Sequence, residues 1–327
     1  MSICLITPPS SFLLDERVFM NIGILRVAKV LEDANIEVGM VDLSGVDNYT
    51  DTIRYHCKNS SFIQFGITAT TPQLPATVEI QQAIRNEIPF AKIILGGPHV
   101  TLVNAAFKRE KRLSINGRAS RAMADLIRLF DVLVAGDGEH AVFHALESSA
   151  PKLIDADDQK SPLFLKNDEL VELPFPARHL VDVDSYHYHI DGERALSLIA
   201  QLGCPFGCGF CGGRLAPFLR IVRIRPTENV IKEMKLMYET YGNKGFMLYD
   251  DELNVNTQML DLMRSIRRLQ DELGVEFRLR GFIKSELFTD EQAEAMYQAG
   301  FRWILVGFES GSPRILEKGG DCSPSFF

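Results

Sequence analysis

Residues 1–148 alternate between two hydrophobic periods, and this alternation restricts the possible folds more than any other feature of the chain. Five short apolar runs have the length of buried strands, and amphipathic stretches of helical length separate and follow them. Such a repeat predicts a doubly wound parallel sheet with helices on both faces. The predicted strands are Ile3–Thr7, Glu37–Asp42, Phe62–Thr68, Lys92–Leu95 and Asp131–Ala135, and the predicted helices are 20–34, 48–59, 75–87, 119–129 and 139–148.

Loops rich in glycine and proline follow three of these strands. They are Pro8-Pro9, Gly96-Gly97-Pro98 and Gly136-Asp137-Gly138. Ligands of open α/β sheets bind at the carboxyl ends of the strands, so we expect any ligand of this domain there. Residues 108–121 carry six Lys or Arg and one Glu. We interpret them as a solvated excursion before the fifth strand, with a phosphate-binding patch as the alternative.

The character of the chain changes at residue 149. Four prolines, an acidic run and weak periodicity over 149–190 predict a linker. Alternation then resumes, and four strands with three intervening helices indicate a partial (β/α) barrel over 191–327. The predicted strands are Ala195–Gln201, Gly245–Tyr249, Val275–Arg280 and Arg302–Phe308, and the helices are 227–241, 257–273 with Asn256 as N-cap, and 290–299 with a Thr289–Gln292 capping box and Gly300 at its end.

Composition excludes several classes of protein. With 46% hydrophobic and 24% charged residues, the chain can bury ordinary cores, which excludes a disordered or collagen-like chain. A net charge of -8 argues against broad binding to nucleic acid or an anionic membrane. The sequence has no apolar run of about 18 residues and no secretion signal. Because half of the six cysteines cluster within eight residues, we expect a reducing, cytoplasmic location.

The clustered cysteines carry the sharpest chemical signal. Cys204, Cys208 and Cys211 have the spacing C-x3-C-x2-C in a glycine-rich loop, Gly203–Gly213, directly after a predicted strand. Three thiolates on one loop can hold three irons of a cubane cluster and leave the fourth iron open. The alternative is a zinc site in which His187 or His189 supplies a fourth ligand. We favour the cluster, because structural zinc loops usually pair two C-x2-C knuckles and the sequence has no second one.

With Phe210 just before its last cysteine, this loop resembles the signature of radical S-adenosylmethionine (SAM) enzymes. Four further segments resemble motifs of members that carry an N-terminal cobalamin-binding domain, and they occur in the same order. These segments are Leu173–Arg178, Tyr249–Glu252, Leu279–Phe282 and Gly307–Gly311. The resemblance covers nearly the whole chain.

The resemblance implies a mechanism and the residues that serve it. Cys204, Cys208 and Cys211 would bind a 4Fe-4S cluster, whose open iron takes the amino and carboxylate groups of SAM. Reductive cleavage of SAM would yield a 5'-deoxyadenosyl radical that abstracts hydrogen from an unactivated carbon. The implied SAM contacts are Asp250, Asp251 and Arg280 at the methionyl end, Glu309 and Ser310 at the ribose, and Phe210 at the adenine. The alternatives for these residues are a helix cap, a surface ion pair and a turn.

For the N-terminal domain the resemblance implies cobalamin. The residues that would contact it are Thr68, Thr70, Gly96, Gly97, Gly136 and Gly138. The usual D-x-H-x-x-G cobalt-ligand motif is absent after the first strand, and the first histidine of the chain is His56. The alternative is a structural sheet domain that binds no cobalamin.

The expected activity is cobalamin-dependent methyl transfer to an unactivated carbon. The alternatives are oxidative cyclisation, rearrangement, or a truncated, non-catalytic cobalamin-binding module. We expect a small-molecule or peptide substrate, an electron donor such as flavodoxin or ferredoxin, no nucleic acid and no membrane insertion. Barrels of this family usually have about six strands, so the tail Lys318–Phe327 suggests a C-terminal truncation that leaves this chain poorly active on its own.

Overall fold

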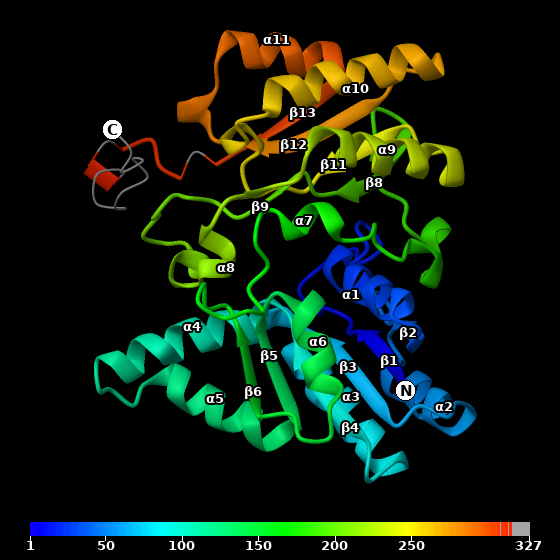
Figure 1. The fold of residues 1–327 in the computed structure, drawn as a ribbon, viewed down its shortest axis with the longest axis vertical. Helices are drawn as coiled ribbons and strands as arrows, with labels where there is room; N and C mark the ends of the chain where they lie inside the picture. Colours follow the sequence, from blue (N-terminus) through cyan, green and yellow to red (C-terminus); the bar gives the residue numbers. More distant parts are fainter. Residues whose placement is uncertain (308, 313, 316–327) are drawn as a thin grey trace. The chain divides into compact units, whose positions relative to one another are not determined.

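The computed structural model describes residues 1–307, 309–312 and 314–315 of the chain (Figure 1). These residues form two compact units. The first unit comprises Met1–Leu165, Leu173–Ser185 and Leu215–Phe218, and the second comprises the remaining described residues. The tail Lys318–Phe327, on which the expectation of a truncation rests, lies outside the described residues. The predicted domain limits at residues 148 and 190 stay predictions.

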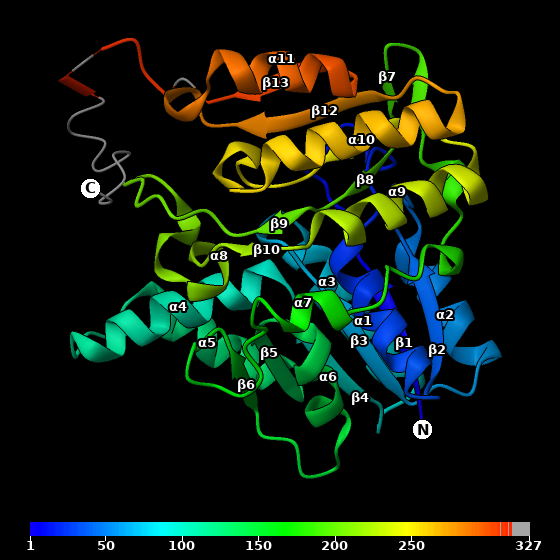
Figure 2. The same cartoon turned by 45° about the horizontal axis from the view of Figure 1, so that its top comes forward.

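The first unit is built on a parallel sheet of six strands in the order β2-β1-β3-β4-β5-β6 (Figure 2). The prediction of a doubly wound parallel sheet is therefore confirmed. The strand order reverses between β1 and β3, and open sheets of this type bind ligands at such a switch point. The elements are β1 (Ser2–Thr7), α1 (Ile22–Asp33), β2 (Glu37–Asp42), α2 (Tyr49–Asn59), β3 (Gln64–Thr68), α3 (Leu74–Glu87), β4 (Lys92–Gly96), α4 (Pro98–Arg112), α5 (Arg118–Leu129), β5 (Val132–Gly136), α6 (Gly138–Leu146) and β6 (Leu153–Ala156).

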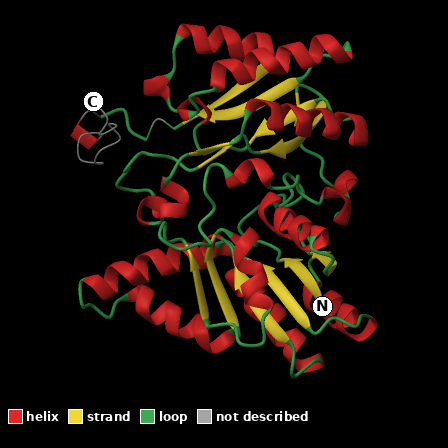
Figure 3. Ribbon diagram, viewed as in Figure 1, coloured by secondary structure: helices red, strands yellow, loops and turns green. Residues whose placement is uncertain are grey.

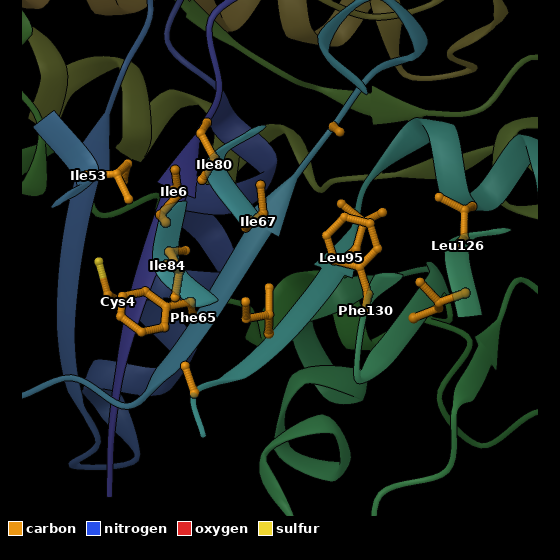
Figure 4. Packing of buried hydrophobic residues seen from close by; sticks show 14 of the residues in the cluster. Cys4, Ile6, Ile53, Phe65, Ile67, Ile80, Ile84, Leu95, Leu126 and Phe130 are labelled. Atoms are coloured by element: carbon orange, nitrogen blue, oxygen red, sulfur yellow. The ribbon is translucent and has the colours of Figure 1, made fainter. Parts of the chain in front are cut away.

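A continuous apolar cluster covers one face of this sheet (Figure 4). Phe65 and Ile67 of β3 and Leu95 of β4 contribute from the sheet, and Ile84 of α3 and Leu126 of α5 contribute from helices. Each of these five side chains is at most 3% exposed. Alternate residues of a strand point to opposite faces, so Phe65 and Ile67 lie on the same face of the sheet. This packing fixes where the carboxyl ends of the strands lie.

Two segments of this unit differ from the sequence-based expectation. The sequence analysis did not predict helix α4, because Gly96-Gly97-Pro98 is typical of a turn. In the structure Pro98 is the first residue of α4, a position at which its missing N–H breaks no helical hydrogen bond. The basic segment 108–121 contains the end of α4 and the start of α5. The Glu110 carboxylate accepts from the backbone N–H groups of Gly117 and Ser120 at the N-terminus of α5.

The segment expected to be a linker also contributes to the first unit. Strand β6 pairs with β5 in parallel register, so 149–190 is more ordered than its prolines suggest. Partly buried and buried residues alternate over Leu153–Ala156, and this short pattern is easily missed among charged neighbours. Further along, the Ala177 N–H donates to the Leu25 carbonyl of α1 at 2.9 Å.

The second unit contains an open sheet in the order β13-β12-β11-β8-β7 (Figure 3). Strands β8, β11, β12 and β13 are parallel and follow one another in the chain, which confirms the partial barrel. The elements are α7 (Glu169–Glu172), β7 (His189–Ile190), β8 (Glu193–Leu198), β9 (Gln201–Leu202), β10 (Arg223–Ile224), α9 (Thr227–Tyr241), β11 (Gly245–Leu248), α10 (Met259–Leu273), β12 (Arg278–Ile283), α11 (Asp290–Ala299) and β13 (Phe301–Val306), and α8 (Pro217–Arg220) spans the division between the units.

Local signals placed most of these elements correctly. The Thr289–Gln292 capping box opens α11, and Gly300 ends it in the left-handed conformation. Helix α10 begins at Met259, so Asn256 is not its N-cap, although the Asn256 side chain accepts from the N–H of Gln258, the residue directly before the helix. Strand β12 begins later than predicted, because the Phe277 N–H is used by the Gln270 side chain, which closes the turn after α10.

A buried ion pair holds the start of α9 against the end of β8. The Arg225 guanidinium lies 2.7 Å from the Glu233 carboxylate, and their side chains are 5% and 1% exposed. The same guanidinium donates to the Ile199 carbonyl and to the Asn229 side chain. An ion pair with this many hydrogen bonds fixes the chain just before the cysteine loop.

We predict that Gly136→Ala destabilises the first unit strongly. Gly136 has a φ of +88°, and a Cβ there would lie 2.4 Å from the carbonyl carbon of Ala156. Gly45 is the matched control, because its φ is +68° but its nearest neighbouring atoms are 4.0 Å away. Gly45→Ala should cost about 1–2 kcal/mol from backbone strain alone, and Gly136→Ala about 2 kcal/mol more. Urea unfolding followed by circular dichroism measures both, and equal losses would contradict the prediction.

We predict that Glu233→Ala costs about 3–5 kcal/mol of stability, because it leaves the Arg225 charge buried without its carboxylate. The control is Glu272→Ala, which removes an exposed partner of Lys235. That exposed pair should contribute about 1 kcal/mol or less. Thermal unfolding compares the two variants, and a loss for Glu233→Ala as small as that of the control would contradict a structural role for the buried pair.

Candidate functional site

The cysteine loop is pinned at its base by close backbone contacts. Gly203 has a φ of +83°, and a Cβ there would lie 2.1 Å from the Ile221 carbonyl oxygen, so only glycine fits. The next residue, Cys204, donates its backbone N–H to the Leu219 carbonyl at 3.0 Å. The loop therefore leaves the short strand β9 and returns beside its own starting point.

The three cysteines of this loop are partly exposed and form no disulfide with any described residue. The Cys211 N–H donates to the Cys208 carbonyl at 3.0 Å, which makes a tight turn between the second and third cysteines. Within the described residues, no three His, Cys, Asp or Glu side chains converge as they would on one ion. A cubane cluster does not require such convergence, since each thiolate binds a different iron. Three cysteine thiols on one loop with a fixed base fit a 4Fe-4S cluster.

Charged groups surround the first of these thiols. Burial raises the pKa of Cys204, the nearby Asp251 and Glu252 raise it further, and the Arg220 guanidinium opposes them. Arg220 also donates to the Pro205 carbonyl inside the loop. Iron binding requires the thiolate, so a cation at this position favours the form that binds metal.

Asp250 has a structural position that the sequence does not reveal. Its side chain is 2% exposed, and one carboxylate oxygen accepts the backbone N–H groups of Ala200 and Gln201, the former at 2.9 Å. Burial raises the pKa of Asp250 to about 7. Its other oxygen accepts no hydrogen bond from any described residue. Asp250 thus shapes the turn from β8 into the cysteine loop, and its contact with SAM stays a prediction.

Three carboxylates gather at the carboxyl ends of β11 and β13. Asp251 accepts a hydrogen bond from the Gly203 backbone. The charges of Asp251 and Glu309 both act on the Glu252 carboxylate. Burial raises the pKa of Glu252 to about 7, the two neighbouring carboxylates add to this, and the Lys284 ammonium opposes it. The structure thus brings the predicted Asp251 close to the cysteine loop and the predicted Glu309 close to Glu252, and adds Glu252 and Lys284.

Arg280 lies on β12, where the register with β13 shifts between Leu279 and Arg280. Irregularities of this kind re-aim side chains next to functional sites. Its guanidinium donates to the Tyr188 hydroxyl, and its Nε makes no hydrogen bond with any described residue. The side chain is therefore anchored at one end and has a donor left over for an anion.

The remaining predicted SAM contacts lie on exposed or turning segments. Phe210 is 60% exposed on the cysteine loop, so its ring is available to a planar ligand. Glu309 has a φ of +48°, and the Ser310 hydroxyl accepts the Ser312 N–H at 3.1 Å. These two residues form a tight turn after β13, and their contact with ribose stays a prediction.

In the first unit, most of the residues predicted to contact cobalamin pack against or hydrogen-bond to other residues of the chain. A Cβ at Gly97 would lie 2.6 Å from the Thr68 hydroxyl, and the Thr70 hydroxyl bonds to the Gln73 side chain. A Cβ at Gly138 would lie 2.9 Å from the Val27 side chain. At Gly96, by contrast, the nearest atoms would be 3.8 Å away. Internal packing therefore explains Gly97, Gly136 and Gly138 without a ligand.

His99 is a candidate that the sequence analysis missed. It follows Gly97 in the first turn of α4 and is 8% exposed. Its Nδ1 lies 3.0 Å from the Thr71 hydroxyl, whereas its buried Nε2 has no hydrogen-bond partner among the described residues. An unpaired buried nitrogen at the carboxyl ends of β3 and β4 fits a polar group of a bound ligand. Its position directly after Gly96-Gly97-Pro98 is the signal that could have identified it.

Comparison with known proteins gives a family match over the part of the chain that contains the cysteine loop. Residues 198–325 match the model of the radical SAM superfamily. Residues 198–325 thus carry a radical SAM domain. A domain of this kind implies a 4Fe-4S cluster and SAM as cofactors.

Two relatives of this radical SAM chain extend into its first unit. An uncharacterised methyltransferase of Pyrococcus horikoshii is 26% identical over 324 residues, which cover 97% of the chain and 67% of that protein. The anaerobic magnesium-protoporphyrin IX monomethyl ester cyclase of Cereibacter sphaeroides is 26% identical over 306 residues, covering 86% of the chain and 46% of that protein. The chain thus spans about half to two thirds of the length of these relatives.

Solved structures share the fold across both units. The radical SAM methyltransferase TsrM of Kitasatospora setae has a TM-score of 0.70 at 19% identity, covering 98% of this chain and 62% of TsrM. The cobalamin-dependent radical SAM enzyme OxsB has a TM-score of 0.71 at 16% identity, covering 98% of this chain and 45% of OxsB. None of the helices in the described part of the chain is long and apolar enough to cross a membrane.

We predict that replacing Cys204, Cys208 or Cys211 by alanine abolishes the cluster of this radical SAM chain, because three thiolates are needed to hold the cubane. Anaerobic reconstitution should load about four irons per wild-type chain and less than about one per variant. Cys57→Ala is the control, because this cysteine lies buried on α2 of the first unit. Iron content that survives loss of any loop cysteine, or that falls with Cys57→Ala, would contradict the assignment.

Proposed function

We propose that this chain is the catalytic core of a cobalamin-dependent radical SAM methyltransferase that acts on an unactivated carbon. The observation that carries the proposal is the cysteine loop, whose first thiol lies near the Asp251 and Glu252 carboxylates. Arg280, on the strand next to β11, is anchored to the Tyr188 hydroxyl. The match of residues 198–325 to the radical SAM model supports a 4Fe-4S cluster and SAM at this loop. The methyl-transfer outcome and the role of cobalamin are the parts that we propose.

Cys204, Cys208 and Cys211 would hold the cluster, and the open iron would face SAM. When bound, the cluster and SAM supply reductive cleavage of SAM, and cobalamin supplies a methyl carrier. The residues of the chain would bind and orient these cofactors and exclude water from the site.

The charges around the loop suit the two ends of the SAM molecule. SAM carries a sulfonium and an α-ammonium, both cationic, and one carboxylate. Asp251, Glu252 and Glu309 form an acidic group that would attract the cationic centres, and the spare donor of Arg280 would bind the carboxylate. Phe210 would stack on the adenine from its exposed position on the loop.

Cobalamin is supported by the first unit and by the structural neighbours. TsrM is solved with cobalamin and a 4Fe-4S cluster bound, and OxsB with aqua-cobalamin and SAM bound. In this chain, the open space at Gly96 and the unpaired Nε2 of His99 fit a ligand at the carboxyl ends of the strands. Thr68, Thr70, Gly97, Gly136 and Gly138 stay proposed neighbours of that ligand.

The relatives favour methyl transfer and keep one alternative. The Pyrococcus relative is named a methyltransferase and aligns with 97% of this chain. The Cereibacter relative is named a cyclase, so oxidative cyclisation is the second candidate. We further propose a small-molecule or peptide substrate, flavodoxin or ferredoxin as electron donor, and a cytoplasmic location.

The proposal predicts that the reconstituted, reduced chain cleaves SAM to 5'-deoxyadenosine. Asp251→Asn and Glu309→Gln should each weaken SAM binding about tenfold, because each removes a charge that faces the cationic centres. Glu276→Gln is the matched control, since this carboxylate is 79% exposed before the amino end of β12. Product analysis by mass spectrometry and SAM binding by equilibrium dialysis measure the effects.

A loaded cluster that yields no 5'-deoxyadenosine above background would contradict the proposed SAM chemistry. The cobalamin part has a separate test. Hydroxocobalamin should co-elute with the wild-type chain on anaerobic gel filtration, and His99→Ala should reduce the retained amount. Wild-type protein that elutes without cobalamin would favour the structural-domain alternative. Transfer of a labelled methyl group from SAM to an acceptor would separate methyl transfer from cyclisation.

A further inference from the structure

Lys284 is held at the carboxyl end of β12 by an unusual backbone clamp. The Asn254 side chain donates to the Lys284 carbonyl at 2.8 Å and accepts the Lys284 N–H at 2.9 Å. Asn254 lies in the segment after β11 and is 7% exposed. A side-chain amide that satisfies both backbone groups of one residue fixes that residue as rigidly as a strand pairing would.

The side chain of this clamped lysine reaches the cysteine loop. Its Nζ lies 4.7 Å from the ring centroid of Phe206, which stands between Cys204 and Cys208. The Phe206 ring is 4% exposed and the Lys284 side chain 13% exposed, so water screens the contact weakly. An ammonium over an aromatic face is an attractive contact that strengthens as it is desolvated.

Among the described residues, the carboxylates of Glu286 and Glu252 interact with the Lys284 ammonium. Glu286 lies 3.3 Å away, is 55% exposed and belongs to the same segment of chain. Glu252 interacts with Lys284 across the site and also acts on Cys204. The ammonium therefore offsets a negative field that would otherwise act on the thiolates.

We propose that Lys284 is a positioning residue of the cluster loop, which seats the Phe206 ring and raises the reduction potential of the cluster held by Cys204, Cys208 and Cys211. This inference rests on the cluster assigned above. Reduction adds one electron to the cluster, so a fixed positive charge nearby stabilises the reduced form. Arg220 supplies a second cation to the same loop through the Pro205 carbonyl.

The test is a redox titration of the reconstituted cluster, followed by electron paramagnetic resonance in the absence of SAM. Omitting SAM excludes any effect that Lys284 has on SAM binding. Lys284→Met keeps the length of the side chain and removes its charge. We expect the reduction equilibrium to fall about tenfold, which corresponds to a potential about 59 mV more negative.

Three further variants sharpen the interpretation. Lys284→Arg keeps the charge and can stack on the ring, so its potential should match that of the wild type. Phe206→Leu should shift the potential in the same direction as Lys284→Met, and the double variant should shift it no further than Lys284→Met alone. Lys235→Met is the matched control, because this lysine on α9 pairs with Glu272 and should leave the potential unchanged.

A wild-type potential in Lys284→Met with full iron content would overturn the proposal. If Lys284→Met loses its cluster, the potential of Lys284→Arg distinguishes the outcomes. A cluster retained in Lys284→Arg at the wild-type potential supports the role of the charge. Loss of the cluster in Lys284→Arg as well overturns the proposal. A wild-type chain that assembles no cluster would overturn both this inference and the function on which it rests. A normal wild-type cluster with no effect of Lys284 would overturn this inference alone.

Discussion

The turn from β8 into the cysteine loop depends on one buried carboxylate. Asp250, at the end of β11, accepts the backbone N–H groups of Ala200 and Gln201. This contact joins positions 49 and 50 residues apart in the chain and ties the exit of β8 to the neighbouring strand. The cysteine loop begins three residues later, so its position relative to Asp251 and Glu252 follows from that contact. The Arg225–Glu233 pair holds the same turn from its other side through the Ile199 carbonyl.

In both units, the candidate functional residues follow the carboxyl ends of parallel strands. Parallel strands end at one edge of a sheet, so the loops that follow them gather there. In the second unit this edge collects the cysteine loop, the carboxylates after β11 and β13, and Lys284 after β12. In the first unit it collects Gly96, His99 and Thr71 after β3 and β4. The chemistry of each unit thus depends on which residues happen to follow its strands.

The sequence was sufficient for the succession of most strands and helices along the chain and for the cysteine loop, because both are encoded by local patterns. The sequence was insufficient to predict the role of a residue where that role depends on contacts between residues far apart in the sequence. Helix α4 was missed because Gly97-Pro98 signals a turn and a helix start equally well. The two adjacent aspartates, Asp250 and Asp251, look equivalent in sequence, and only the fold buries the first under a backbone turn. The unpaired nitrogen of His99 and the contact of Lys284 with Phe206 likewise appear only once the strands are aligned.

The most direct test of the central claim is the electron paramagnetic resonance spectrum of the reconstituted, reduced chain before and after addition of SAM. The account predicts a 4Fe-4S signal whose shape changes when SAM occupies the open iron beside the Asp251, Glu252 and Glu309 carboxylates. A cluster signal that is indifferent to SAM would contradict a SAM site at this loop. Zinc in place of iron would contradict the cluster itself.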